Sequence, residues 1–188
     1  MKIPETLSYD DVLLVPQYSD IRSREECDTS TVIGPGVELK IPIISSCMDT
    51  VTEAEMAAAI ARLGGLGVIH RYNTPEHQAQ LVKTAVEHAG GGPVAAAIGV
   101  TDDYFKRASL LLDAGASALC IDVAHGHHIL VKEVLEELRA THGEGLCIIA
   151  GNVATKQGIN DLADWGANAV RCNIGGGSIC STRIQTGH

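Results

Sequence analysis

Six short apolar runs alternate with segments of helical period, and this alternation constrains the fold more than any other feature of the sequence. The strand-like runs are residues 41–46, 66–70, 93–99, 118–124, 146–151 and 169–174. The segments of helical period between them are residues 53–64, 74–88, 101–115, 128–141 and 155–165. Continuously apolar strands are typical of parallel sheets, in which both faces are covered. The pattern therefore predicts an α/β fold built from successive βα units.

Two architectures are built from such units, the doubly wound sheet and the (β/α)₈ barrel. Polar, glycine-rich or reactive residues follow every strand, in "SSCMDT", "IHRYN", "IGVTDD", "DVAHGH", "AGNVAT" and "NIGGGSIC", whereas the turns from helix to strand are plain. A doubly wound sheet would concentrate its ligand residues at one switch point. We therefore expect a (β/α)₈ TIM barrel, represented by about six of its eight βα units. We expect residues 1–188 to form a single domain of this type that is truncated at its C-terminus.

Residue types at the helix starts indicate where two of the helices begin. Thr74 is a suitable N-cap with Pro75 at the first helical position, and Thr101 is the expected N-cap of the segment 101–115.

Composition narrows the classes of partner and of cellular setting. The formal net charge is −9 and Lys and Arg do not cluster, which argues against nucleic-acid binding, although backbone N–H groups could still hold a phosphorylated small molecule. No apolar run reaches the roughly 18 residues of a membrane span.

The six cysteines have irregular spacing without a CxxC pair, and "MKIPETLSYDD" has no basic and apolar leader, so we expect a reducing, cytoplasmic setting. We expect Cys47, Cys120, Cys147 and Cys172 to be buried, because they lie in or beside apolar runs.

The segment "NIGGGSICSTR", residues 173–183, places a cysteine in a glycine-rich loop. Glycine allows close approach of the backbone to a ligand, so the loop could hold a phosphate with its N–H groups and Ser178, or it could be a simple tight turn. Cys180 lies among backbone dipoles with Arg183 nearby, a setting that favours the nucleophilic thiolate. The alternative is that Cys180 is a small structural residue.

Two further loops carry candidate ligand residues. Asp122 ends the fourth strand-like run, where an acid commonly accepts hydrogen bonds from a ribose. His125, His127 and His128 follow it, but their spacing matches no common zinc pattern, so we do not expect a metal there. Asn152 could either read a base or sugar or simply form a turn.

Six segments together resemble the IMP dehydrogenase and GMP reductase family. They are "LSYDDVLLVP" (7–16), "SSCMDTVTEAEMA" (45–57), "GGLGVIHR" (64–71), "DVAHGH" (122–127), "AGNVAT" (150–155) and "GGGSICSTR" (175–183). They occur in the family's order and span nearly the whole chain.

The resemblance implies a barrel, usually tetrameric, that acts on a purine nucleoside 5′-monophosphate with NADPH or NAD. Cys180 matches the nucleophile that attacks purine C2, and Thr182 the threonine that helps to handle water or ammonia. Matches to residues that touch the nucleotide are Ser46, Met48, Ser178 and Asn152, with Ser178 as a phosphate ligand. Asp122 matches the acid near the cofactor ribose. In the dehydrogenases, carbonyls equivalent to those of Gly175, Gly177 and Cys180 hold a monovalent cation, usually K⁺.

The two branches of the family share a thioimidate between the cysteine and purine C2. A reductase converts GMP and NADPH to IMP and ammonia, whereas a dehydrogenase converts IMP, NAD⁺ and water to XMP. Three features resemble the reductases: Val123 in "DVAHG", the "TG" at 186–187, and the short connection from His70 to Val94, which leaves no room for the regulatory insert of many dehydrogenases. The segments "MDTVTEAEMA" and "GSICSTR" fit both branches, and GMP reductase is the expectation, with IMP dehydrogenase as the alternative.

The resemblance also implies that activity needs residues beyond 188, because the last two strands, their phosphate loops and the family's mobile flap are not in this sequence. A nucleotide-binding barrel without turnover is the alternative from another functional class. A third possibility is another phosphate-binding barrel in which Cys180 has only a structural role.

Overall fold

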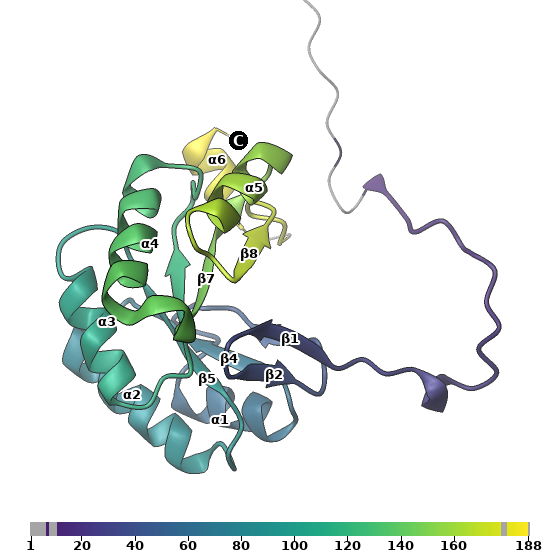
Figure 1. Ribbon diagram of the computed structural model, residues 1–188, viewed down its shortest axis with the longest axis horizontal. Coiled ribbons are helices and arrows are strands. Elements are labelled where there is room, and N and C mark those ends of the chain that lie inside the picture. The colour runs from purple at the N-terminus through teal and green to yellow at the C-terminus, as the bar shows by residue number, and fades with distance from the viewer. Residues whose placement is uncertain (1–6, 8–10, 178–179, 188) are drawn as a thin grey trace, which may run out of the picture.

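The computed structural model describes residues 7, 11–177 and 180–187. At its centre lies a six-stranded parallel sheet in which each strand pairs with the next one along the chain. The sheet curls into a half-barrel (Figure 1), so the predicted α/β fold, a partial TIM barrel, is confirmed. Its strands are β3 (Ile44–Ser45), β4 (Leu66–Ile69), β5 (Val94–Ile98), β6 (Ala118–Asp122), β7 (Cys147–Val153) and β8 (Ala169–Cys172).

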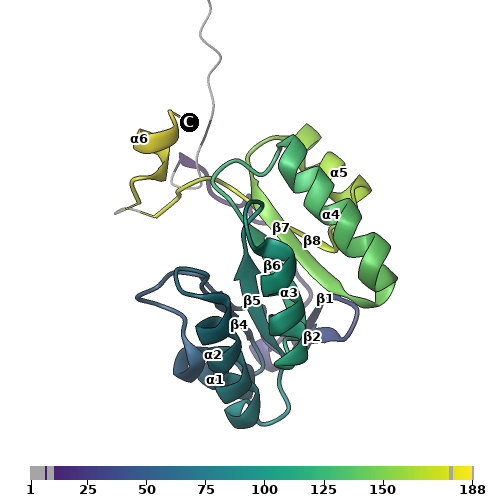
Figure 2. The same ribbon diagram turned by 90° about the vertical axis from the view of Figure 1, so that its left-hand side faces the viewer.

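Helices connect successive strands and cover the outer, convex face of the sheet (Figure 2). They are α1 (Ala54–Arg62), α2 (Pro75–His88), α3 (Tyr104–Asp113), α4 (Ile129–His142) and α5 (Lys156–Asp164). A short helix, α6 (Thr182–Thr186), follows β8 and stands apart from this layer. Short 3₁₀ turns occur at Arg24–Glu26 and Gly143–Gly145.

The N-caps of α2 and α3 test the two predicted helix starts. Thr74 is the N-cap of α2 and accepts a hydrogen bond from the N–H of His77, with Pro75 at the first helical position, as predicted. The prediction that Thr101 caps the next helix is wrong, because α3 begins after Asp103. Asp102 has a φ of 59°, so the chain makes a left-handed turn between Thr101 and the helix.

The sheet separates two apolar cores. Alternate residues of each strand point to opposite faces, so Ala95 and Ala97 of β5 lie in the inner core while Val94, Ala96 and Ile98 lie in the outer one. The outer core lies between the sheet and the helices, and the inner core fills the concave side of the sheet. Burial on both faces explains why the strands are apolar throughout.

A β-hairpin that the sequence analysis does not predict covers one end of the inner core. Strands β1 (Thr31–Gly34) and β2 (Val37–Leu39) pair in antiparallel register around a turn at Pro35 and Gly36. Val37 and Leu39 are almost completely buried in the inner core. Gly34 lies so close to β7 that a Cβ atom there would be 2.7 Å from the sulfur of Cys147, so the hairpin is in tight contact with the sheet.

The half-barrel has two sheet edges, β3 and β8, which do not pair with each other in the described part of the chain. Ile44 of β3 is 44% exposed, and Cys172 of β8 is also exposed. The prediction that Cys172 is buried is therefore wrong, whereas Cys47, Cys120 and Cys147 are buried as expected. A strand covered on only one edge leaves its outward residues open to solvent.

Candidate functional site

The carboxyl ends of the parallel strands meet at one end of the half-barrel, which we call the mouth. Four segments at this end carry sequence-predicted site residues: the loop after β3, the ends of β6 and β7, and the loop after β8, which leads into α6. Parallel strands bring these segments together although they lie far apart in the sequence.

The loop after β3 presents Ser46 and Met48 to solvent. Both are exposed, and Met48 has 48% of its surface accessible. The carbonyl of Ser46 accepts hydrogen bonds from the N–H of Met48 and from the hydroxyl of the buried Thr52, so a tight turn fixes the loop. Two side chains predicted to touch a nucleotide are thus accessible at the mouth.

Asp122, at the end of β6, forms an ion pair with Arg171 of β8. The side chains are 18% and 32% exposed, respectively, and both residues lie on the inward-facing positions of their strands. The sequence reasoning missed Arg171, although an arginine within the apolar run "AVRCNI" is a visible signal of a charged group with a specific partner. The Asp122 carboxylate therefore already has a cationic partner in the protein.

Arg71, which follows β4, adds a second guanidinium to the mouth. Its Nη2 donates to the carbonyl of Asp122 at 3.3 Å, and its Nε is buried with no hydrogen-bond partner among the described residues. A buried donor without a partner carries a desolvation cost that an oxygen-rich ligand can remove. This orphaned donor beside Asp122 fits the ribose and phosphate oxygens of a nicotinamide cofactor.

Asn152 ties two loops of the mouth together. Its side-chain Nδ2 donates to the carbonyl of Asn173 at 3.0 Å, and its backbone N–H donates to the carbonyl of Val123 at 2.9 Å. The carbonyl of Asn152 accepts from Gly126. The side-chain amide of Asn152 thus holds the start of the loop that carries Cys180.

The loop after β8 returns on itself and leads to Cys180. Gly175 has a φ of 56°, and a Cβ atom there would lie 3.2 Å from the Cys180 sulfur. The N–H of Cys180 donates to the carbonyl of Gly177 at 3.0 Å, and the Nε of Arg183 donates to the carbonyl of Ile174 at 2.9 Å. Ser178, the predicted phosphate ligand, lies outside the described residues.

The Cys180 thiol is exposed and lies 3.2 Å from the hydroxyl oxygen of Thr182. Hydrogen bonds from the side chain and backbone of Thr182, and then the positive charge of Arg183, lower the pKa of Cys180. A lowered pKa increases the thiolate fraction at neutral pH, and the thiolate is the form that attacks carbon.

The backbone carbonyls of Gly175, Gly177 and Cys180 are hard oxygen donors of the kind that a monovalent cation prefers. The Gly177 carbonyl accepts one internal hydrogen bond and has a second lone pair for a ligand. The donor type fits K⁺, although Arg183 lies on the same side of the loop as Gly175.

The three loop histidines have local partners. His127 Nε2 lies 2.7 Å from the carboxylate of Asp161 and its ring contacts Trp165, so it joins the loop to α5. His128 is the N-cap of α4 and accepts from the N–H of Leu130. Among the described residues, no group of three or more His, Cys, Asp or Glu side chains could hold a metal ion.

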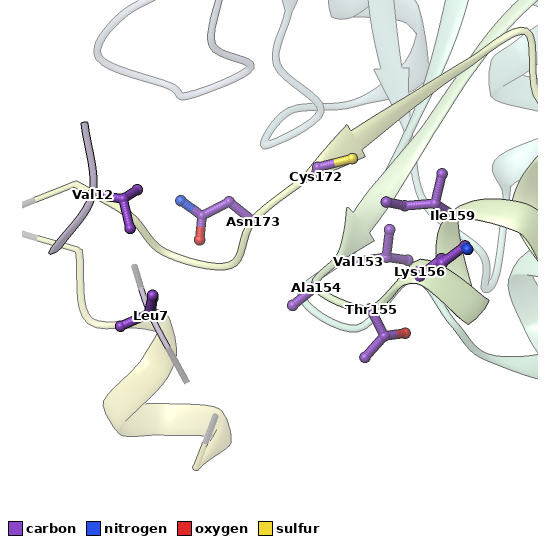
Figure 3. Close-up of a pocket in the computed structure, with 9 residues that line it drawn as sticks. All are labelled: Leu7, Val12, Val153, Ala154, Thr155, Lys156, Ile159, Cys172 and Asn173. Atoms are coloured by element: carbon purple, nitrogen blue, oxygen red, sulfur yellow. The ribbon is translucent and has the colours of Figure 1, made fainter. Parts of the chain in front are cut away.

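A cavity of about 370 Å³ lies beside the mouth (Figure 3). Its lining residues include Val153 and Cys172, which are the last residues of β7 and β8, Thr155 at the N-cap of α5, Asn173 after β8, and Leu7 of the N-terminal segment. Neither Cys180 nor Asp122 lines it. The cavity is thus next to the predicted reaction site and shares only the strand end that leads to Cys180.

None of the helices in the described ranges is both long and apolar enough to cross a membrane.

Comparison with known proteins assigns the family. The model of the IMP dehydrogenase / GMP reductase domain matches residues 6–188. The chain is 34% identical to the inosine-5′-monophosphate dehydrogenase of Cryptosporidium parvum, over 98% of this chain and 55% of that protein. It is also 34% identical to the GMP reductases of Mesoplasma florum, over 95% of this chain, and of Acidovorax ebreus, over 97%, and it covers 55% of each.

The chain spans about half the length of these curated relatives. The relatives are divided between the two activities at equal identity. The match across nearly all of its residues nevertheless fixes its membership: the chain belongs to the IMP dehydrogenase / GMP reductase family.

Proposed function

We propose that this chain is the thiol-bearing part of a purine nucleotide oxidoreductase, and that its activity is GMP reductase. The observation that carries the proposal is the exposed Cys180 thiol, whose pKa is lowered by Thr182 at the end of a glycine-rich loop. An accessible thiolate at the carboxyl end of a barrel strand is suited to nucleophilic attack on a ligand at the mouth.

In this proposal, the Cys180 thiolate adds to C2 of GMP, and the C2 amino group leaves as ammonia to give a thioimidate. The hydroxyl of Thr182, which contacts the sulfur, donates the proton that the leaving amino group takes up. Ser46 and Met48 contact the nucleotide from the loop after β3, and Ser178 binds its phosphate. A bound nicotinamide cofactor, NADPH for the reductase, supplies the hydride that C2 receives as the bond to sulfur breaks.

Asp122 and Asn152 have supporting roles in the proposal. Asp122 accepts hydrogen bonds from the cofactor ribose while Arg171 balances its charge. Asn152 holds the loop in place through Asn173 and can still accept a hydrogen bond from the nucleotide with its side-chain oxygen. The carbonyls of Gly175, Gly177 and Cys180 would hold K⁺ and so stiffen the loop.

Two features support the reductase over the dehydrogenase. A short loop, helix α2 and a glycine-rich turn make up the connection from β4 to β5, which leaves no inserted module there. Val123 follows Asp122 in the mouth, as in the reductase pattern. IMP dehydrogenase is the second candidate, because the Cryptosporidium dehydrogenase is as similar to this chain as the two reductases are.

The proposal extends to the whole protein that contains this chain. We propose a cytoplasmic homotetramer in which residues beyond 188 complete the barrel and supply the rest of the site. Residues 1–188 would then belong to a single catalytic domain without a regulatory insert.

The test uses the full-length protein in two mixtures, GMP with NADPH and IMP with NAD⁺, while the absorbance of the reduced nicotinamide is followed. We expect NADPH to be consumed with GMP, and Cys180→Ser to abolish the change. NAD⁺ reduction with IMP would instead establish the dehydrogenase. No change in either mixture would overturn the proposal and would favour a nucleotide-binding barrel without turnover.

A further inference from the structure

Two cysteines other than Cys180 come together inside the half-barrel just below the mouth. Cys47 follows β3, and Cys120 lies in the middle of β6, with strands β4 and β5 between them in the sheet. Both belong to the inner core, with exposed fractions of 5% and 0%. They are distant in sequence, so only the curl of the sheet brings them together.

A single nitrogen atom contacts both sulfurs. The Nη1 of Arg171 lies 3.2 Å from the sulfur of Cys47 and 3.9 Å from that of Cys120. The same guanidinium is paired with Asp122. The four side chains therefore form one polar cluster, in which the two thiols are buried and Asp122 and Arg171 are partly exposed.

The pKa values of the two thiols are shifted in opposite directions. The hydrogen bond from Cys120 lowers the pKa of Cys47, and the charge of Arg171 adds to this effect against burial and Asp122. For Cys120, the hydrogen bond to Cys47 and complete burial raise the pKa. Cys47 is thus the more acidic thiol of the two, an asymmetry typical of dithiols that undergo exchange.

Cys147 shows what a purely structural cysteine looks like in the same core. It is fully buried on the inner face of β7, and burial raises its pKa to about 11. Its close neighbour is the backbone of Gly34.

We propose that Cys47 and Cys120 are a redox-sensitive pair that a peroxide converts to an intramolecular disulfide. The Cys47 thiolate attacks one peroxide oxygen, the O–O bond breaks, and the products are a sulfenic acid on Cys47 and hydroxide or alkoxide. The Cys120 sulfur then attacks the sulfenic sulfur and displaces hydroxide, which takes up the Cys120 proton to leave as water. Two electrons pass from the two sulfurs to the peroxide, and a thiol reductant reverses the change.

The location of the pair gives the disulfide a structural effect. Cys47 lies between Ser46 and Met48, so a covalent bond to β6 would pull on the loop that presents these two residues at the mouth. Arg171 would lose its contact with the Cys47 thiolate and keep only Asp122 as an anionic partner. The 5% exposure of Cys47 admits a molecule as small as hydrogen peroxide more readily than a bulky alkylating reagent.

The test is disulfide mapping on the full-length protein and needs no activity. Protein treated with hydrogen peroxide is alkylated under denaturing conditions, digested without reductant and analysed by mass spectrometry. We expect a linked pair of peptides that contain Cys47 and Cys120, which disappears after treatment with dithiothreitol. Recovery of both cysteines fully alkylated, while the exposed Cys180 and Cys172 are oxidised, would overturn the proposal.

Variants sharpen the result. In Cys120→Ser the sulfenic acid on Cys47 has no thiol to attack it, so dimedone should label Cys47 and the linked peptide should be absent. Cys147→Ser is the matched control, a buried cysteine on the same face of the sheet, and should leave the Cys47–Cys120 link unchanged. Cys180→Ser should also leave it unchanged, and loss of the link in that variant would show that the pair is oxidised only through Cys180.

Discussion

The hydroxyl oxygen of Thr182 lies 3.2 Å from the sulfur of Cys180, two residues earlier in the chain. The contact joins the glycine-rich loop after β8 to the first residue of α6, and it is the first of the causes that lower the pKa of the thiol. The reactivity of the proposed nucleophile therefore depends on how a short helix begins.

Removal of this hydroxyl should make Cys180 less reactive. In Thr182→Val the side-chain hydrogen bond is lost and the backbone one remains, so the pKa of Cys180 should rise towards that of an ordinary cysteine. Because the thiolate forms as the pH rises through the pKa, the rise in the rate of iodoacetamide labelling should move to higher pH. Thr182→Ser keeps the hydroxyl and should behave like the wild type. An unchanged pH profile in Thr182→Val would contradict the role of Thr182.

Arg171 should stabilise the mouth through Asp122. Arg171→Met leaves a largely buried carboxylate without its cation, which we expect to lower the free energy of unfolding by roughly 2 kcal/mol, less than the loss of a fully buried pair because both side chains are partly exposed. Urea denaturation measures the change. Lys132→Met, which removes one partner of the exposed pair with Glu136, is the control and should cost less than about 0.5 kcal/mol. Equal losses in the two variants would show that Arg171 is no more than a surface charge.

The β1–β2 hairpin should contribute to stability by sealing the inner core. Leu39 is 1% exposed, and Leu39→Ala should lower the free energy of unfolding by about 3 kcal/mol through lost burial and the cavity left behind. Val32 of β1 is 67% exposed, so Val32→Ala should have a much smaller effect. Similar thermal unfolding of both variants would mean that the hairpin does not seal the core.

The contact between α1 and β4 should require glycine at position 67. A Cβ atom there would lie 2.3 Å from the Cα of Ala57, so Gly67→Ala should force the helix off the sheet and cost about 2 kcal/mol or more. Gly145→Ala is the matched change, since an added Cβ there meets nothing within 4 Å. A Gly67→Ala protein as stable as the wild type would contradict the observed packing.

The strands and helices were predictable because burial on both faces of a parallel sheet produces long apolar runs. The start of α3 was not, because the left-handed turn at Asp102 places the cap two residues beyond Thr101. The hairpin is difficult to predict because its strands are short and only alternate residues, such as Val37 and Leu39, are buried. Its signal was the Pro35–Gly36 turn between two apolar segments.

Site residues were predictable by type and place within a loop but not by partner. Asp122 could be assigned to a strand end, whereas its ion pair with Arg171 depends on the adjacency of β6, β7 and β8 and on the inward direction of both side chains. The same holds for Cys47 and Cys120, which the sequence indicates as two separate buried residues. Cys172 was misplaced because its apolar run gives no indication that β8 is an edge strand.

The most direct test of the central claim is site-resolved alkylation of the six cysteines in the full-length protein, with and without GMP. Iodoacetamide near neutral pH should label Cys180 before the other five, and GMP should protect it. Slow, uniform labelling of all six cysteines, or rapid labelling of Cys180 that GMP does not affect, would contradict the claim that this thiol is the nucleophile of a purine nucleotide site.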